Sequence, residues 1–147
     1  MDWKVTHVGV VVKDMDKAVE YYRSVFGIGP FRKMEIPVTE GEVRGAPCQS
    51  TLKLAFARLG EVQLELMQAE PGENIYWEFF QRHGEGLHHL GFDMKEEDSE
   101  AELTRLKSMG IGVLQKGRTD GISFVYLDSA HIGGTILELI LRRQPQV

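Results

Sequence analysis

Cysteine is almost absent from this chain, because Cys48 is the only one among 147 residues. One thiol excludes an intrachain disulfide and a zinc site built from several cysteines, and it fits a reducing compartment. Long apolar runs are also missing. The longest candidate, residues 8–12, is far shorter than the roughly 18 residues of a membrane span. Residues 1–4 lack the features of a secretory signal, so we expect a cytoplasmic protein without a membrane partner.

Positive charge is scarce as well. The 17 lysine and arginine residues against 22 aspartate and glutamate residues give a net charge of −5. Such a chain is a poor general ligand for nucleic acid, so we expect none as a partner. The hydrophobic fraction of 42% and the charged fraction of 27% are typical of a folded globular protein. We expect residues 1–147 to form a single domain.

A repeated order of elements is the clearest pattern in the chain. The first copy, about residues 4–70, begins with a β-branched strand and continues with a helix capped by Asp14 and ended by Gly27. We expect its strands at 5–12, 31–37, 51–58 and 62–68, with a long loop at 39–50 that is rich in glycine.

The second copy, about residues 87–142, follows a linking helix at about 74–83. Its helix is expected to be capped by Asp98 or Ser99 and to run through Met109. Its strands are expected at 87–94, 111–116, 122–127 and 134–141. Two βαβββ units expose one sheet face each, and pairing them buries a shared concave surface. The sequence therefore predicts an α+β fold, with two paired βαβββ modules that form a cup-shaped mixed sheet.

Each copy places one histidine and one glutamate among apolar strand residues. The first strands both read His-apolar-Gly-apolar, at His7 and His89, and the last strands both read Leu-Glu-Leu, at Glu65 and Glu138. Because strand side chains alternate between two faces, these four residues are predicted to face the concave side while the leucines face the helices. The glycine two residues after each histidine leaves space on that same face.

A buried carboxylate needs a partner, and two imidazoles with two carboxylates suit a divalent transition metal. We therefore predict that His7, Glu65, His89 and Glu138 bind zinc, cobalt, nickel or manganese at the centre of the cup. The alternative is that each is a solvated residue on an open sheet face. His88, which aligns with Thr6 in the other copy, is expected to face the helix layer and to have a structural role.

These motifs resemble those of the vicinal oxygen chelate superfamily, which includes glyoxalases, bleomycin resistance proteins and dioxygenases. The resemblance is carried by His-Val-Gly-Val at 7–10, Gly-Glu-Gly-Leu-His-His-Leu-Gly-Phe at 84–92 and Gly-Gly-Thr-Ile-Leu-Glu-Leu-Ile at 133–140, and it spans about residues 4–142. It implies paired βαβββ modules around a metal held by the same four residues. The middle and last motifs are most similar to those of methylmalonyl-CoA epimerases.

The resemblance implies an isomerase or lyase that works through an enolate-type intermediate, with an acyl-CoA thioester as the small-molecule substrate. It further implies that Glu138 is the base, with Glu65 across the metal as its counterpart, and that the protein is a homodimer. The alternatives are a glyoxalase I-type lactoylglutathione lyase and a binding protein that sequesters a metal-chelating molecule. Residues 46–51 contain no carboxylate where epimerases carry a second catalytic glutamate; Glu40 or Glu42 can replace it only by swinging in from the expected loop.

Overall fold

Among residues 2–143, strands make up most of the secondary structure, and three helices lie against them. The computed structural model describes residues 2–143. In chain order the elements are β1 (Lys4–Val12), α1 (Met15–Phe26), β2 (Arg32–Val43), β3 (Ala46–Pro47), β4 (Ser50–Leu59), β5 (Val62–Gln68), α2 (Ile75–His83), β6 (Gly86–Lys95), α3 (Glu96–Ser108), β7 (Val113–Thr119), β8 (Ile122–Leu127) and β9 (Ile136–Arg142). None of these helices is long and apolar enough to cross a membrane.

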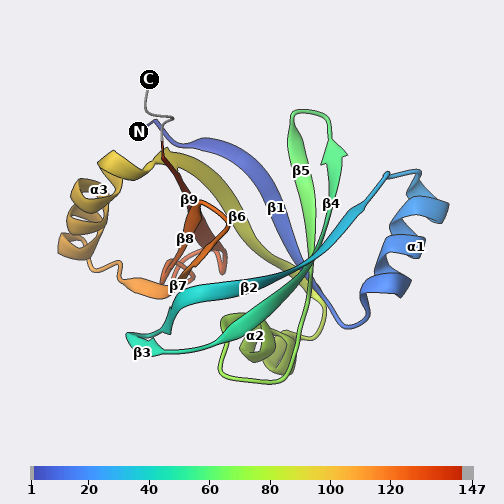
Figure 1. The fold of residues 1–147 in the computed structure, drawn as a ribbon, viewed down its shortest axis with the longest axis horizontal. Helices are drawn as coiled ribbons and strands as arrows, with labels where there is room; N and C mark the ends of the chain where they lie inside the picture. Colours follow the sequence, from blue (N-terminus) through green and yellow to red (C-terminus); the bar gives the residue numbers. More distant parts are fainter. Residues whose placement is uncertain (1, 144–147) are drawn as a thin grey trace.

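The strands form one mixed sheet whose order is symmetric about its centre. The order is β3-β2-β4-β5-β1-β6-β9-β8-β7, so β1 and β6 lie side by side in the middle (Figure 1). They are antiparallel to each other, while β1 is parallel to β5 and β6 is parallel to β9. The first strand of each module therefore lies between the last strand of its own module and the first strand of the other. The predicted α+β fold with a cup-shaped mixed sheet is confirmed.

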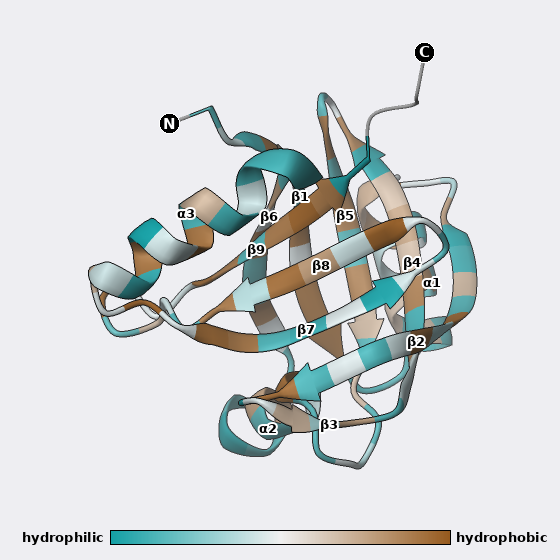
Figure 2. Cartoon of the chain, turned by 60° about the vertical axis from the view of Figure 1, so that its left-hand side comes forward, coloured by the Kyte–Doolittle hydropathy of each residue, from teal (hydrophilic) through white to brown (hydrophobic). Residues whose placement is uncertain are grey.

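The two ends of the sheet also meet, because β2 pairs with β7. Figure 2 shows these two strands running next to each other below α3. β2 first pairs with β4 and then changes partner near Glu40, a residue with a positive φ of 52°. The expected loop at 39–50 is therefore wrong. Gly41 does not break the strand, because an irregularity between Thr39 and Glu42 lets β2 bend and continue to Val43. Gly45 lies in the turn between β2 and β3.

Apolar side chains fill three regions, as strand alternation predicts. One cluster lies between α1 and the first module and includes Leu64 and Leu66 of β5. A second lies between α3 and the second module and includes Leu139 of β9. The third fills the interior of the sheet, where Tyr76 of α2 packs on residues from both modules. Figure 1 shows α1 and α3 on opposite outer sides, with α2 at one end.

The boundaries of three further elements, α3, β7 and β9, also differ from the sequence predictions. α3 begins at Glu96 rather than after Asp98 or Ser99, and no side chain in the described part of the chain caps it. Glu96 is held there by ion pairs with Arg118 of β7 and with Arg143, which follows β9. Sequence spacing does not reveal these contacts. β7 covers 113–119 instead of 111–116. β9 begins at 136 because Gly133 and Gly134 both have positive φ, which a regular strand excludes.

Candidate metal centre

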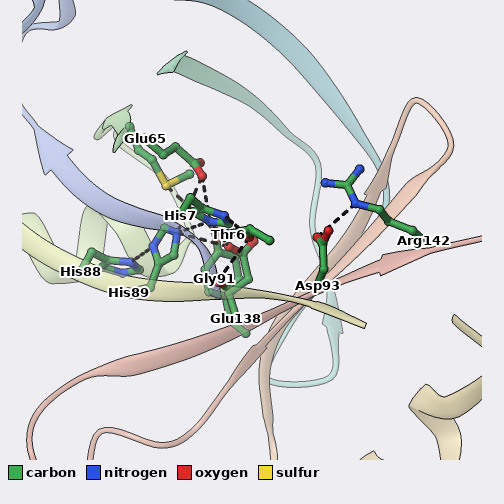
Figure 3. A network of polar contacts seen from close by, with 11 residues as sticks. Thr6, His7, Glu65, His88, His89, Gly91, Asp93, Glu138 and Arg142 are labelled. Atoms are coloured by element: carbon green, nitrogen blue, oxygen red, sulfur yellow. Dashed lines mark hydrogen bonds and ion pairs between the residues drawn. The ribbon is translucent and has the colours of Figure 1, made fainter. Parts of the chain in front are cut away.

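Four polar side chains meet in the interior of the sheet, at its centre. They are His7 on β1, Glu65 on β5, His89 on β6 and Glu138 on β9, and Figure 3 shows them pointing toward one another. Between 0% and 6% of each residue is exposed to solvent. Each module contributes one imidazole and one carboxylate, so the group is complete only when both modules are present.

The ligand atoms crowd around a common point. His7 Nε2 lies 2.8 Å from Glu138 Oε2 and 3.0 Å from Glu65 Oε2. His89 Nε2 lies 3.2 Å from Glu138 Oε2 and 3.9 Å from Glu65 Oε2. The two Nε2 atoms are themselves 3.1 Å apart. One ligand atom from each residue can be chosen so that all lie within 4.8 Å of one another.

Two glycines create the room for this convergence. A Cβ atom added to Gly9 on β1 would overlap the ring of His89, and one added to Gly91 on β6 would overlap the ring of His7. The space that the sequence predicts beside each histidine is therefore occupied by the histidine of the other module. This reciprocal packing brings both imidazoles to the same point between β1 and β6.

The neighbours of the glutamates repeat the same symmetry. Glu65 lies beside Gly9 of β1 and Phe56 of β4 in the strand register. Glu138 lies beside Gly91 of β6 and Tyr126 of β8. The ring of Tyr126 also packs at 5.1 Å on that of His89. Neither aromatic residue stands out in the sequence, because their positions opposite the glutamates depend on strand register.

Charge within the group changes the pKa of its members. Burial acts to lower the pKa of His7, but hydrogen bonds with Glu138 and Glu65, together with the negative charges of these two residues, raise it to about 10. Burial also acts to lower the pKa of His89, and the charge of Glu138 again raises it. Burial acts to raise the pKa of Glu138, whereas the charge of His89 and the hydrogen bond with His7 lower it. The two carboxylates thus stabilise positive charge between them.

The donor set fits a divalent cation better than it fits hydrogen bonding. Two N–H donors repel each other at the 3.1 Å that separates the histidine Nε2 atoms, whereas two nitrogen lone pairs can share one cation. Ligand atoms lie about 2 Å from zinc, so adjacent ligand atoms lie roughly 3 Å apart. Most of the distances in the group are close to that value. A cation would also replace the imidazole protons as the positive charge beside the carboxylates.

His88 occupies a different place from the one expected. It does not face α3; its ring packs inside the sheet on Tyr76 and Phe79 of α2 and on His89. The cause is an irregular register between β1 and β6, in which Gly9 pairs with His89 but Val10 pairs with Leu87. Strict alternation cannot anticipate this, because an extra residue shifts the following side chain to the other face.

The two carboxylates of the expected loop lie away from the group. Glu42 pairs with Lys116 at 2.8 Å on β7, and Glu40 lies 3.6 Å from Arg118. The side chain of Glu40 is 71% exposed. Neither is placed as a second acid or base, so Glu65 is the remaining carboxylate of the group beside Glu138.

Comparison with known proteins identifies similar chains. The model of the glyoxalase/bleomycin resistance protein/dioxygenase superfamily matches residues 6–126. Mitochondrial methylmalonyl-CoA epimerase of Mus musculus is 23% identical over 142 residues, which cover 93% of this chain and 74% of the relative.

Two solved structures have similar folds. A hypothetical protein from Bacillus halodurans C-125 gives a TM-score of 0.70 at 19% identity, with 100% of this chain and 99% of the other covered. Methylmalonyl-CoA epimerase from Mycobacterium tuberculosis gives 0.66 at 21% identity, with 96% and 88% covered. At these identities the likeness establishes the fold alone.

Proposed function

Since the chain belongs to the glyoxalase/bleomycin resistance protein/dioxygenase superfamily, we propose that it is a divalent-metal-dependent isomerase. Its reaction is the epimerisation of an acyl-CoA thioester similar to methylmalonyl-CoA, through an enolate-type intermediate. The observation that carries this proposal is the convergence of His7, Glu65, His89 and Glu138 in the interior of the sheet. The similarity to an epimerase along 93% of the chain supports the substrate class.

The four residues would hold zinc, cobalt, nickel or manganese. When bound, the cation supplies positive charge opposite the carbonyl oxygen of the substrate, where negative charge develops as the α proton leaves. The buried surroundings of the group strengthen such charge interactions because the interior has a low dielectric constant. His7 and His89 contribute neutral nitrogen ligands, so the carboxylates alone balance the charge of the cation.

Glu138 is the residue to which we assign proton removal. Epimerisation takes a proton from one face of the α carbon and returns a proton to the other face, so it needs an acid or base on each side. Glu65 and Glu138 come from different modules and approach His7 Nε2 at 3.0 and 2.8 Å. We assign the return of the proton to Glu65 because it is the other carboxylate of the group.

The apolar interior is suited to the acyl part of such a substrate. Phe56 beside Glu65 and Ile140 two residues after Glu138 belong to the apolar cluster inside the sheet or pack on it. Apolar side chains around a carboxylate exclude bulk water, and exclusion of bulk water strengthens the charge interactions that stabilise the enolate.

Exchange of the α proton tests the proposal directly. Purified protein, loaded in turn with each of the four metals, is incubated with methylmalonyl-CoA in deuterated water, and the α-proton signal is followed by nuclear magnetic resonance. We expect metal-dependent loss of the signal together with loss of stereochemical purity. Absence of metal uptake would refute the metal centre. Binding of the thioester without exchange would instead indicate a sequestering protein.

A glyoxalase I-type lyase is the second candidate, because its bacterial forms resemble this chain in using two histidines and two glutamates. That reaction also begins with proton removal next to a carbonyl group. The same preparation is therefore assayed with the hemithioacetal of glutathione and methylglyoxal. Formation of the lactoyl thioester, with no exchange of methylmalonyl-CoA, would favour the lyase over the epimerase.

A further inference from the structure

Each of the two central histidines is contacted by the residue that precedes it. Thr6 Oγ1 lies 3.1 Å from Nδ1 of His7, and Nδ1 of His88 lies 2.9 Å from Nδ1 of His89. In both histidines the other ring nitrogen, Nε2, is the one directed at the carboxylates. Each imidazole is thus contacted at Nδ1 by a residue of its own module, and the two modules repeat this arrangement (Figure 3).

Paired bulges explain how neighbouring residues can share a face. Between the pairs Val5–Phe92 and His7–Gly91, β1 advances by two residues while β6 advances by one. Thr6 is therefore the extra residue of a bulge on β1.

Between the pairs Gly9–His89 and Val10–Leu87 the situation is reversed. Here β6 contains the extra residue, and that residue is His88. A bulge breaks the alternation of side chains and redirects one of them. The two bulges occupy equivalent positions in the repeat, because Thr6 aligns with His88.

The proton positions follow from which nitrogen faces the centre. An imidazole that binds a cation through Nε2 has its remaining proton on Nδ1. His7 then donates to Thr6 Oγ1, and the hydroxyl group donates in turn to the Gly91 carbonyl oxygen at 3.3 Å. His89 donates to Nδ1 of His88, so His88 must have its own proton on Nε2.

The environment of His88 agrees with this assignment. Its Nε2 is buried and has no hydrogen-bond partner among residues 2–143, and the ring packs on Tyr76 and Phe79. A buried polar atom without a partner is unfavourable. An apolar ring would fill this place without leaving a buried polar atom unpaired. The imidazole is therefore best explained by the hydrogen bond that its Nδ1 accepts from His89.

We propose that Thr6 and His88 are a matched pair of positioning residues that accept the Nδ1 protons of His7 and His89. They thereby fix the rings with Nε2 toward the metal and increase metal affinity. The proposal rests on the proposed metal centre, but it does not depend on which reaction the protein catalyses. Groups that bond to the free nitrogen of a ligand histidine typically increase metal affinity about 10- to 100-fold.

Four single variants separate this role from simple packing. Thr6→Val keeps the shape of the side chain and removes the acceptor, whereas Thr6→Ser keeps the acceptor. His88→Phe keeps an aromatic ring among Tyr76 and Phe79 without an acceptor. His88→Asn loses the ring but retains an oxygen near the position of Nδ1. Circular dichroism and thermal unfolding establish that each variant is folded before metal is added.

Cobalt(II) is the probe, because it fits the same ligands and its visible absorption reports their geometry. Affinity is measured by competition with a chelator. We expect Thr6→Val and His88→Phe to bind cobalt about 10- to 100-fold more weakly, with altered absorption bands. The affinities and spectra of Thr6→Ser and His88→Asn should stay near those of the unmodified protein.

Other results of the cobalt titrations would contradict the proposal. Unchanged cobalt affinity in folded Thr6→Val and His88→Phe would overturn it, and so would equal losses in His88→Asn and His88→Phe, which would indicate packing alone. Should His88→Phe not fold, the two Thr6 variants must still differ as stated. An unmodified protein that takes up no cobalt overturns this proposal together with the metal centre. Cobalt uptake without epimerase activity leaves the metal centre intact.

Discussion

Gly9 and Gly91 are the smallest residues of the candidate metal centre, and the histidines depend on them. Replacing Gly9 by alanine would place a Cβ atom within the ring of His89. The ring cannot keep its position, so we expect Gly9→Ala to lower the free energy of unfolding by about 1–3 kcal/mol and to weaken metal binding. Urea unfolding and cobalt titration measure the two effects.

Gly112 provides the matched control for that substitution. No atom of residues 2–143 lies within 4 Å of a Cβ atom added to Gly112, apart from its chain neighbours, and its backbone is not in the left-handed region. Gly112→Ala should therefore leave both stability and metal affinity nearly unchanged. If Gly9→Ala behaved in the same way, the close packing of His89 against β1 would be wrong.

Glu138 carries the main catalytic assignment. Glu138→Gln retains the size of the side chain but removes the group that accepts the proton, so we expect exchange of the substrate α proton to fall by about 10²- to 10⁴-fold. The same nuclear magnetic resonance assay measures it, with metal content determined in parallel so that loss of metal is recognised. Glu40→Gln, whose side chain is 71% exposed outside the group, is the control. Full activity in Glu138→Gln would refute the assignment.

At the scale of single residues, the sequence alone predicted that the four central side chains share one face of the sheet. Alternation was sufficient for His7, His89, Glu65 and Glu138. Side chains alternate regularly between each of these residues and its predicted neighbours on the same face. His88 was misplaced because it is the extra residue of a bulge. A bulge is set by the pairing of two strands distant in sequence, and one strand read by itself does not reveal it.

Among the elements, the contact between β2 and β7 joins the outer strands of the two modules. A Cβ atom at Gly117 of β7 would overlap Val38 of β2, and it would come within 2.8 Å of Phe124 Cζ. We expect Gly117→Ala to lower the free energy of unfolding by about 1–3 kcal/mol and to speed hydrogen exchange in 113–119. Mass spectrometry of exchanged amides locates the effect.

The ion pair across the same contact should matter less. Lys116 Nζ lies 2.8 Å from Glu42 Oε2, but the two side chains are 50% and 35% exposed. Exposed pairs contribute about 0–1 kcal/mol. Faster amide hydrogen exchange of residues 113–119 in Lys116→Ala than in Gly117→Ala would show that charge, rather than close backbone packing, holds β2 against β7.

Elements were predictable where local signals decide them. Asp14 caps α1 through the backbone N–H of Lys17, and Gly27 ends it in the left-handed conformation, as the sequence indicates. The prediction of a loop at 39–50 failed because glycine predicts a break, whereas pairing with β7 extends the β2 strand. The predicted start of α3 was wrong for a similar reason, because ion pairs with residues distant in sequence, Arg118 and Arg143, hold Glu96.

For the whole molecule, metal binding should be linked to pH. The pKa of His7 is raised to about 10, so His7 carries a proton at neutral pH that the metal must displace. Below that pKa, each displaced proton makes the apparent metal affinity rise about tenfold per pH unit. We expect tighter cobalt binding as pH rises from about 6 to about 8, measured by chelator competition.

Two variants identify the origin of that dependence. His7→Gln should bind cobalt more weakly and with a shallower pH dependence, because one displaced proton is removed. His131→Ala changes a histidine whose side chain is 63% exposed and should keep the original slope. Affinity that does not change with pH in the unmodified protein would contradict protonation of the histidines.

Assembly is a further property at this scale. The resemblance to the superfamily implies a homodimer, and α1 exposes Tyr21, Val25 and Phe26 by 53%, 61% and 57%. We expect sedimentation equilibrium to give twice the chain mass of 16.6 kDa. A mass of 16.6 kDa at all protein concentrations would show that the chain is a monomer.

The reciprocal fit of glycine and histidine has an evolutionary consequence. Gly9 makes room for His89, and Gly91 makes room for His7, so each glycine is constrained by a residue of the other module. A descendant that loses His89 releases the constraint on position 9, where a larger side chain then fills the hole. Substitutions at 9 and 89, and separately at 91 and 7, are therefore expected to occur together. A side chain at either glycine position marks a lineage that has given up the metal centre.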